Sequence, residues 1–202
     1  MVHDDVSAAT EHFHSRFNRV IAVVAWVVSA VGVSAILVSG RTDSFAFIGV
    51  LVLISYLAWF GLWRPAVVIS DEGVELVNVS QTVLVPWAAL IQVETRLALT
   101  LKTPRASYVA TAAPAPGRTF TGVNARRAAS VSGETAQPSD SPTSDSGAAA
   151  HLVRARWAAL IESNAIELGV ADEVPVVRRW NVAYLAIAAV LVVASAVLLA
   201  VG

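Results

Sequence analysis

The chain has 202 residues with a formal net charge of −1; 56% of its residues are hydrophobic, 14% are charged and none is cysteine. This composition excludes a strongly charged nucleic-acid-binding surface, and the lack of cysteine excludes disulfides, thiolate metal sites and a thiol nucleophile. The mean hydropathy of +0.65 instead indicates membrane segments.

Three apolar segments are long enough to cross a bilayer. They cover residues 20–39, 45–63 and 182–201, and none contains Asp, Glu, Lys, Arg or His. About 20 helical residues cover the roughly 30 Å hydrocarbon core, and a helix satisfies its own backbone hydrogen bonds there. We therefore predict an N-terminal tail (residues 1–19), a transmembrane hairpin (20–63) and a third transmembrane helix. Four small residues share one face of the first helix, which suits close packing on another helix or a partner: Ala22, Ala25, Ser29 and Gly32.

The arginines flanking these segments predict the orientation. Arg16 and Arg19 precede the first segment, Arg64 follows the second, and Arg178 and Arg179 precede the third. Since basic residues near short spans favour the cytoplasmic side, the tail and residues 64–181 are predicted inside and the C-terminus outside.

Aromatic residues accompany these charges. Trp63 and Trp180 adjoin Arg64 and Arg179, respectively, and tryptophan favours the membrane–water interface. We therefore expect weak headgroup or interface contacts from the residues Arg64, Arg178, Arg179, Trp63 and Trp180.

The first segment has an alternative interpretation as a cleaved signal peptide. Its apolar run is longer than the roughly 7–15 residues of such a peptide, and a second span follows almost at once. We therefore favour a multi-pass protein. Lysine occurs once, at Lys102, in a chain rich in arginine, alanine and valine, which is typical of a high-GC bacterial genome and indicates a bacterial plasma membrane.

Residues 64–113 alternate between apolar and polar positions, as half-buried strands do. Asp71-Glu72-Gly73 separates two short alternating runs and predicts a hairpin, and a third strand is expected to end at Pro86 and Trp87. Residues 91–102 alternate without interruption, so they form either one long bent strand or two strands joined by a cryptic turn. Residues 107–111 are expected to return as a further strand. Together they predict a small antiparallel sheet, with Trp87 in its core.

Two further parts complete the soluble region. Residues 114–147 contain few large apolar side chains and are predicted to be a disordered linker. A helical period follows over residues 148–168, with Val153, Trp157, Leu160, Asn164 and Leu168 on one stripe and Gly169 as the stop. We expect this helix to close the open side of the sheet, with Trp157 as a core aromatic; the alternative is a helix lying on the bilayer. Residues 170–181 form a juxtamembrane linker.

No pattern of catalytic residues is present. The sequence contains no glycine-rich phosphate loop, nucleophile elbow or kinase signature. His12 and His14 are two residues apart and would diverge on a helix. Glu94, Glu162 and Glu167 are expected to be surface charges. We therefore predict no catalytic, cofactor-binding or metal-binding residues, and a protein that is not an enzyme.

Residues 64–113, with the Pro86-Trp87 pair and the later tryptophan helix, resemble the bacterial pleckstrin-homology (PH)-like domain. The preceding membrane hairpin makes the actinobacterial low molecular weight protein antigen 6 family the most similar type. The resemblance implies an α+β fold: a small antiparallel PH-like sheet or partial barrel capped by one C-terminal helix, inserted between two transmembrane helices before it and one after. It also implies more strands than the alternation identifies. Either these strands are missing, or residues 119–123 supply a short one.

Phosphoinositide-binding PH domains elsewhere use basic residues in the first strand–loop–strand, where this chain has Asp71 and Glu72. We therefore expect a membrane protein presenting a cytoplasmic PH-like domain to a membrane or cytoplasmic protein partner, or assembling a membrane complex, without catalysis. The alternative is an inner-leaflet lipid-binding module. The expected partners are the lipid bilayer and a membrane or cytoplasmic protein, with no nucleic acid and no cofactor.

Overall fold

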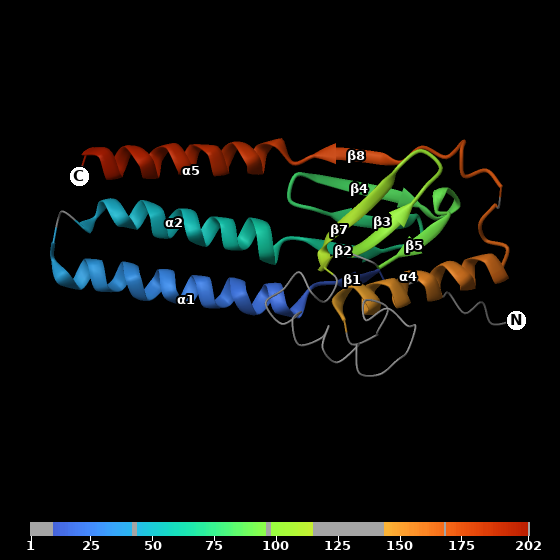
Figure 1. Ribbon diagram of the computed structural model, residues 1–202, viewed down its shortest axis with the longest axis horizontal. Coiled ribbons are helices and arrows are strands. Elements are labelled where there is room, and N and C mark those ends of the chain that lie inside the picture. The colour runs from blue at the N-terminus through green and yellow to red at the C-terminus, as the bar shows by residue number, and fades with distance from the viewer. Residues whose placement is uncertain (1–9, 42–43, 96–97, 115–143, 168, 202) are drawn as a thin grey trace, which may run out of the picture. The chain divides into compact units, whose positions relative to one another are not determined.

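The computed structural model describes residues 10–41, 44–95, 98–114, 144–167 and 169–201. It divides into two compact units. The sheet unit comprises Met1–Ser15, Ala66–Asn78 and Thr82–Arg179, and the helical unit comprises Arg16–Pro65, Val79–Gln81 and Trp180–Gly202. Figure 1 labels most of their helices and strands.

The helical unit contains three helices long and apolar enough to cross a membrane. They are α1 (Arg16–Ser39), α2 (Ala46–Ala58), which continues into the π-helical turn η2 (Trp59–Trp63), and α5 (Val182–Val201). The three predicted helical segments are therefore confirmed as helices, with α1 beginning at Arg16. Helix α2 is central, since both α1 and α5 pack against it.

Small residues allow these helices to approach closely. A Cβ atom at Gly32 of α1 would lie 2.9 Å from Leu51 Cδ1, and one at Gly49 of α2 would lie 2.9 Å from Leu198 Cδ1 and 3.5 Å from Ser195 Cα of α5. Ala22 and Ser29 are buried on α1. The face of α1 predicted for close packing is therefore turned to α2, and small residues there allow the close dispersion contacts typical of apolar helix pairs.

The sheet unit contains a five-stranded sheet of order β1-β2-β3-β4-β8. Its strands are β1 (Glu11–Phe13), β2 (Ala66–Ile69), β3 (Gly73–Val77), β4 (Gln81–Pro86) and β8 (Val177–Trp180). Strands β2 and β3 form the expected antiparallel hairpin, with Val67 opposite Leu76. Its turn needs Gly73, because a Cβ atom there would lie 2.2 Å from the Val85 carbonyl oxygen.

Strands β1 and β8 correct the sequence analysis, which assigned them to the tail and the juxtamembrane linker. Strand β1 has three residues, too few for an alternating pattern to stand out. All four residues of β8 are exposed, so no buried face marks it in the sequence. Both strands lie outside residues 64–113, on which the PH-like resemblance rests.

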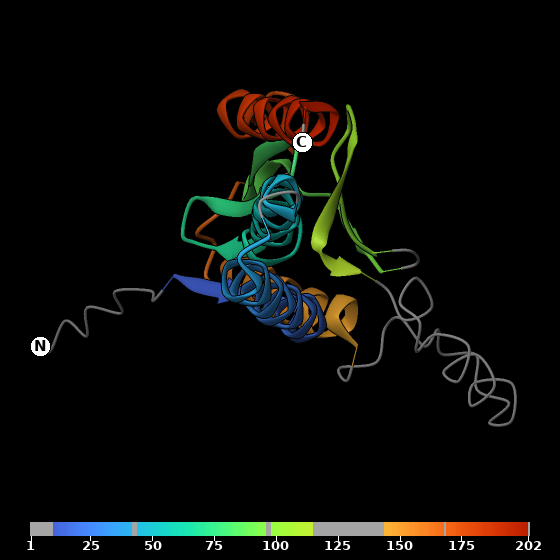
Figure 2. The same cartoon turned by 90° about the vertical axis from the view of Figure 1, so that its left-hand side faces the viewer.

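A second sheet has the order β5-β6-β7, and Figure 2 shows β6 and β7 in yellow-green as a layer apart from the green strands. Its strands are β5 (Gln92–Glu94), β6 (Ala98–Lys102) and β7 (Ser107–Pro114). Gln92 lies opposite Lys102 and Glu94 opposite Thr100, so the chain reverses between β5 and β6. The single long strand is therefore wrong, and the alternative of two strands is confirmed.

The two sheets and helix α4 (Asp145–Glu162) enclose one hydrophobic core. Trp87 is 2% exposed, and its Nε1 donates to the Ser70 carbonyl at 2.9 Å. Val153 of α4 is fully buried, while Trp157 and Leu160 pack against the core. Trp87 therefore lies in the core, Trp157 packs at its margin, and α4 encloses it together with the two sheets.

Both predicted ends of this helix are wrong. Ser144 caps α4 at its N-terminus by accepting from the Gly147 N–H at 3.0 Å, so residues 145–147 are helical rather than part of the linker. Asn164 adopts φ of 53°, and the Ala165 N–H donates to the Leu160 carbonyl at 3.0 Å. This left-handed cap ends the helix before Gly169 and leaves Asn164 exposed. Residues 115–143, with most of the predicted linker and residues 119–123, and Leu168 lie outside the described residues.

Asn78 joins the two sheets through its side chain. It is 7% exposed, its Nδ2 donates to the Val109 carbonyl at 2.8 Å, and its Oδ1 accepts from the Thr111 N–H at 2.8 Å and the Thr111 hydroxyl at 3.0 Å. The amide therefore bonds backbone groups of β7 in the way that a neighbouring strand does.

Replacing Asn78 with alanine should loosen β7. The Val109 and Thr111 backbone groups would lose their partners, so we expect a loss of about 1–3 kcal/mol of stability. Hydrogen exchange of peptides covering residues 107–114 in the full-length protein measures this. Thr111→Val, which removes only the hydroxyl bond, is the control and should cost less; equal exchange in both variants would refute the bridge.

Replacing Gly49 with leucine should weaken the packing of α5 on α2. The new side chain meets the Ser195 backbone, and we expect a cost of about 1–3 kcal/mol from overpacking. Thermal unfolding of the full chain in detergent, followed by circular dichroism, measures the loss. Gly61→Leu is the control, because nothing lies within 4 Å of a Cβ atom at Gly61. An equal loss in both variants would contradict the close approach of α5.

Candidate membrane-interface and interaction sites

One end of the helical unit gathers aromatic and basic side chains. At this end the Arg64 N–H donates to the Trp59 carbonyl at 2.9 Å, which closes the π-helical turn η2. The ring of Trp63 packs against Trp26 of α1 at 5.1 Å between centroids. The guanidinium of Arg64 instead lies 4.3 Å from the ring centroid of Tyr184 on α5. Trp63 at the end of η2 and Arg64 just after it thus contact two different helices.

Four further ring contacts reinforce this end of the unit. They join Tyr56 to Trp59 (5.8 Å) and Phe60 (5.9 Å), and Tyr184 to Trp59 (5.7 Å) and Phe60 (5.9 Å). The Tyr56 hydroxyl also donates to the Tyr184 carbonyl at 2.8 Å. The start of α5 and the end of α2 therefore share an aromatic belt, as helix ends at a membrane–water interface do.

The expected interface residues are only partly brought together. Arg64 lies in the belt and donates to Asn181 Oδ1 at 3.3 Å, and Trp63 lies beside it in sequence. Arg178 and Arg179 lie on β8 with exposed side chains, and Trp180 is 63% exposed. Sequence reasoning missed one contact, in which the Arg19 guanidinium lies 4.9 Å from the Trp63 ring centroid. The only signal for it was the position of Arg19 at the edge of an apolar run.

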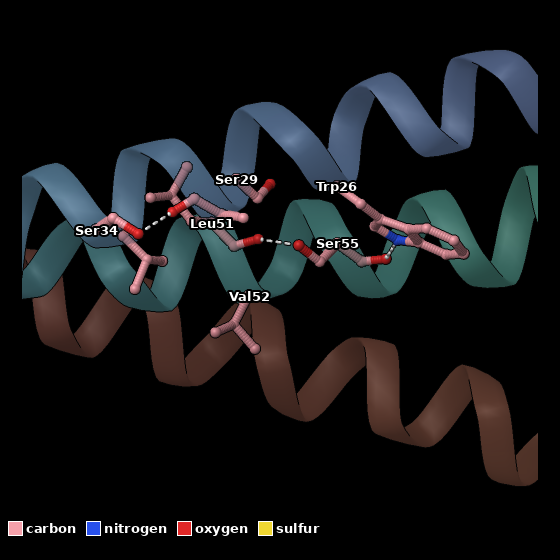
Figure 3. Close-up of a pocket in the computed structure, with 8 residues that line it drawn as sticks. Trp26, Ser29, Ser34, Leu51, Val52 and Ser55 are labelled. Carbon is pink, nitrogen blue, oxygen red and sulfur yellow. Dashed lines mark hydrogen bonds between the residues drawn. The ribbon is translucent and has the colours of Figure 1, made fainter.

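A groove of about 480 Å³ lies between α1 and α2. Figure 3 shows the Trp26 Nε1 donating to the Ser55 carbonyl across the two helices, at 3.0 Å. The hydroxyls of Ser34 and Ser55 donate to carbonyls of their own helices at 2.8 and 2.9 Å. Their donors are used locally, so these two hydroxyls hold helix geometry rather than supply chemistry.

The loop between β2 and β3 is partly neutralised. The Asp71 carboxylate accepts from Arg156 Nη2 of α4 at 2.5 Å, while Glu72 is exposed at the tip. Both Asp71 and Glu72 were predicted to repel an anionic headgroup. Arg156 neutralises Asp71, and Glu72 has no such ion pair with Arg156. The only basic group that these contacts bring to the loop, Arg156, is already engaged by Asp71.

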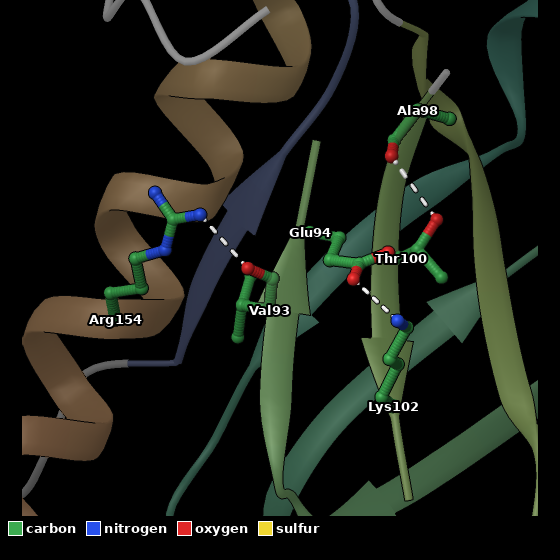
Figure 4. A network of polar contacts seen from close by, with 6 residues as sticks. All are labelled: Val93, Glu94, Ala98, Thr100, Lys102 and Arg154. Atoms are coloured by element: carbon green, nitrogen blue, oxygen red, sulfur yellow. Dashed lines mark hydrogen bonds and ion pairs between the residues drawn. The ribbon is translucent and has the colours of Figure 1, made fainter. Parts of the chain in front are cut away.

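The second arginine of α4 also binds the sheet. Figure 4 shows the Arg154 Nη2 donating to the Val93 carbonyl, at 2.8 Å, and an ion pair between Glu94 and Lys102. Arg154 thereby covers a backbone group of β5 at the sheet margin, where strands otherwise invite pairing. Because both arginines are used by the sheet, these contacts disfavour the alternative of α4 lying on a bilayer. Glu94 was expected as a surface charge and is half-buried.

The side of the three-stranded sheet that faces away from the core carries mixed chemistry. We call this the outer face, and define it by the residues Gln92, Glu94, Thr100, Lys102, Ser107 and Val109. Their neighbours Val93, Leu99, Leu101 and Ala110 are buried, and strand alternation turns the two sets to opposite sides. Val109 is 47% exposed, so an apolar side chain stands beside the Glu94–Lys102 ion pair.

The two described N-terminal histidines correct an expectation. His12 and His14 were expected to diverge on a helix, but His12 belongs to strand β1 and residues two apart on a strand share a face. Their rings are nearly parallel, at 7°, with 6.3 Å between centroids. Within the described ranges, no group of three or more His, Asp or Glu side chains is placed to hold a metal ion.

The comparisons with known proteins give one match. A family model described as a bacterial PH domain matches residues 64–138. No curated protein and no solved structure matches the chain. The match covers strands β2 to β7 and agrees with their antiparallel pairing, whereas the narrower antigen 6 resemblance stays a prediction. Residues 64–138 are therefore similar to bacterial PH domains, in a chain that also has three helices apolar enough to cross a membrane.

Proposed function

We propose that this chain is a multi-pass protein of a bacterial plasma membrane that presents a cytoplasmic PH-like domain to a protein partner, without catalysis of its own. The outer face of the β5–β6–β7 sheet is the surface that meets the partner. The observation that carries the proposal is the exposed Val109 beside the Glu94–Lys102 pair. Burial of an apolar side chain would stabilise a complex, and the charges around it would orient the bound partner.

The charges of the helical unit support the orientation. Arg16, Arg19 and Arg64 adjoin one end of α1 and α2, while Arg41 adjoins the other. The basic end is the one that stays in the cytoplasm under the positive-inside rule. The sheet unit follows Arg64 directly in the chain, so it lies on the same side.

Binding of a headgroup by the PH-like domain is the weaker candidate. The β2–β3 loop presents the exposed Glu72, and Arg156 beside it is paired with Asp71. A phosphate would have to displace that carboxylate and approach the other. A protein partner needs neither rearrangement.

Single cysteines test the sidedness, since the chain has none of its own. In intact cells, a membrane-impermeant maleimide should label Arg41→Cys and leave Ser107→Cys unlabelled until the cells are lysed. Arg41 is the only basic residue predicted outside, so replacing it with cysteine is compatible with the predicted orientation. Labelling of Ser107→Cys in intact cells would reject the topology.

A photo-crosslinking residue at Val109 tests the partner surface. We expect a discrete protein adduct in cells, and a several-fold lower yield when Lys102→Glu places like charges beside Glu94. The matched control is the same probe at Ala158, an exposed position on α4. Adducts to lipid alone, or equal protein adducts from both positions, would overturn the assignment of the outer face.

A further inference from the structure

Arg19 is the charged residue that adjoins the first apolar run, and its guanidinium lies over a tryptophan ring. We propose that Arg19 and Trp63 bind the phosphate of an anionic phospholipid at the basic end of the α1–α2 hairpin. We call this pair the Arg19 seat. The proposal goes beyond the PH-like domain; it depends on the membrane insertion proposed above, and not on the protein partner.

The geometry leaves donors available for an anion. The guanidinium carbon lies over the Trp63 ring, 4.9 Å from its centroid, which is a cation–π contact. A guanidinium has five N–H donors, and a cation–π contact leaves them for hydrogen bonds. The Nε atom is buried and has no hydrogen-bond partner among the described residues. Because protein already covers this atom, the phosphate oxygens would accept charge-assisted bonds from the terminal Nη groups instead.

The helical unit supplies no carboxylate to this arginine. Between Arg16 and Pro65 the sequence contains one acid, Asp43, in the connection at the opposite end of both helices. The segments 79–81 and 180–202 of the same unit contain none. A partly buried cation without a counter-ion in its own unit favours an anion from outside it.

The depth of the seat selects the source of that anion. Arg19 immediately precedes the uncharged run that begins at Val20, which puts it at the level of the lipid headgroups when α1 spans the bilayer. Phosphate groups are fixed at this level, and anionic lipids are enriched on the cytoplasmic side. This position favours a lipid phosphate over the carboxylate of an acidic peptide.

The seat is also held in place by the hairpin. Trp63 packs on Trp26 at 5.1 Å between ring centroids, and Trp26 Nε1 donates to the Ser55 carbonyl at 3.0 Å. Two contacts thus connect the ring beneath Arg19 to the backbone of α2. A ligand binding here would not have to order a free tryptophan side chain first, which lowers the entropic cost of binding.

The experiment uses the full-length protein in nanodiscs that contain phosphatidylglycerol and phosphatidylcholine. Native mass spectrometry of the released protein counts the lipids of each kind that stay bound. We expect wild type to retain phosphatidylglycerol preferentially and Arg19→Gln to lose about tenfold of that preference, as loss of a charge-assisted contact predicts. The matched control, Arg16→Gln, removes the same charge from an exposed position of α1 and should change the preference less than about twofold.

Further arms separate the outcomes. Arg19→Lys keeps the charge but not the planar fork, and an intermediate preference is expected, which also guards against misfolding of the glutamine variant. If the Arg19→Gln and Arg16→Gln variants lost the same preference for phosphatidylglycerol, the effect would come from general surface charge and the Arg19 seat would be overturned. Displacement of the lipid by inorganic phosphate would identify a free phosphate site instead. A properly inserted wild type without preference for phosphatidylglycerol would overturn the seat and leave membrane insertion standing.

Discussion

The long charge-free runs within the three helices impose the constraint on which the rest of this structure depends. A charged side chain in the hydrocarbon core is costly, so charged groups and amphipathic rings gather at the helix ends. In the helical unit they do so as specific contacts: Arg19 lies over Trp63, and Arg64 lies over Tyr184. Trp63, the last residue of the π-helical turn, contacts Trp26 of α1, and Arg64, which follows the turn, contacts Tyr184 of α5. Side chains of all three helices therefore meet at this end of the unit.

The five-stranded sheet is continuous in sequence with all three apolar helices. Two residues separate β1 from α1, two separate η2 from β2, and one separates β8 from α5. A fragment that begins at Arg64 therefore lacks β1 and leaves β2 as an open edge. The same tail reaches α4, since the buried Ser15 hydroxyl donates to the Asp145 carboxylate at 2.5 Å. The five-stranded sheet is thus assembled from strands before and after the α1–α2 hairpin, so experiments on it need the full chain.

The polar side chains of the sheet unit act mostly on its own backbone. Asn78 bonds β7, Arg154 bonds β5, and Trp87 bonds the β2–β3 loop. Each satisfies a strand or loop group that would otherwise need water or another strand. This use of side chains narrows the choice of interaction surface, because it assigns the arginines of α4 to structure. It leaves the outer face of the three-stranded sheet as the surface where an exposed apolar residue meets an ion pair.

The sequence by itself determined the three helices, the β2–β3 hairpin and the core positions of Trp87 and Trp157, since these depend on local charge, alternation and helical period. Alternation alone left open whether residues 91–102 formed one strand or two, because no glycine, proline, asparagine or aspartate marks the reversal near Thr95. Strands β1 and β8 could not be found locally, since short strands acquire their identity from the neighbours they pair with. Helix α4 ends at Glu162 because Asn164 adopts a left-handed conformation. In the sequence, Gly169 is an equally suitable left-handed residue to end the helix. Only the tertiary structure decided that Arg156 pairs with Asp71 and that Arg19 lies on Trp63, because each contact joins residues far apart in the chain, and sequence spacing carries no information about which distant groups meet.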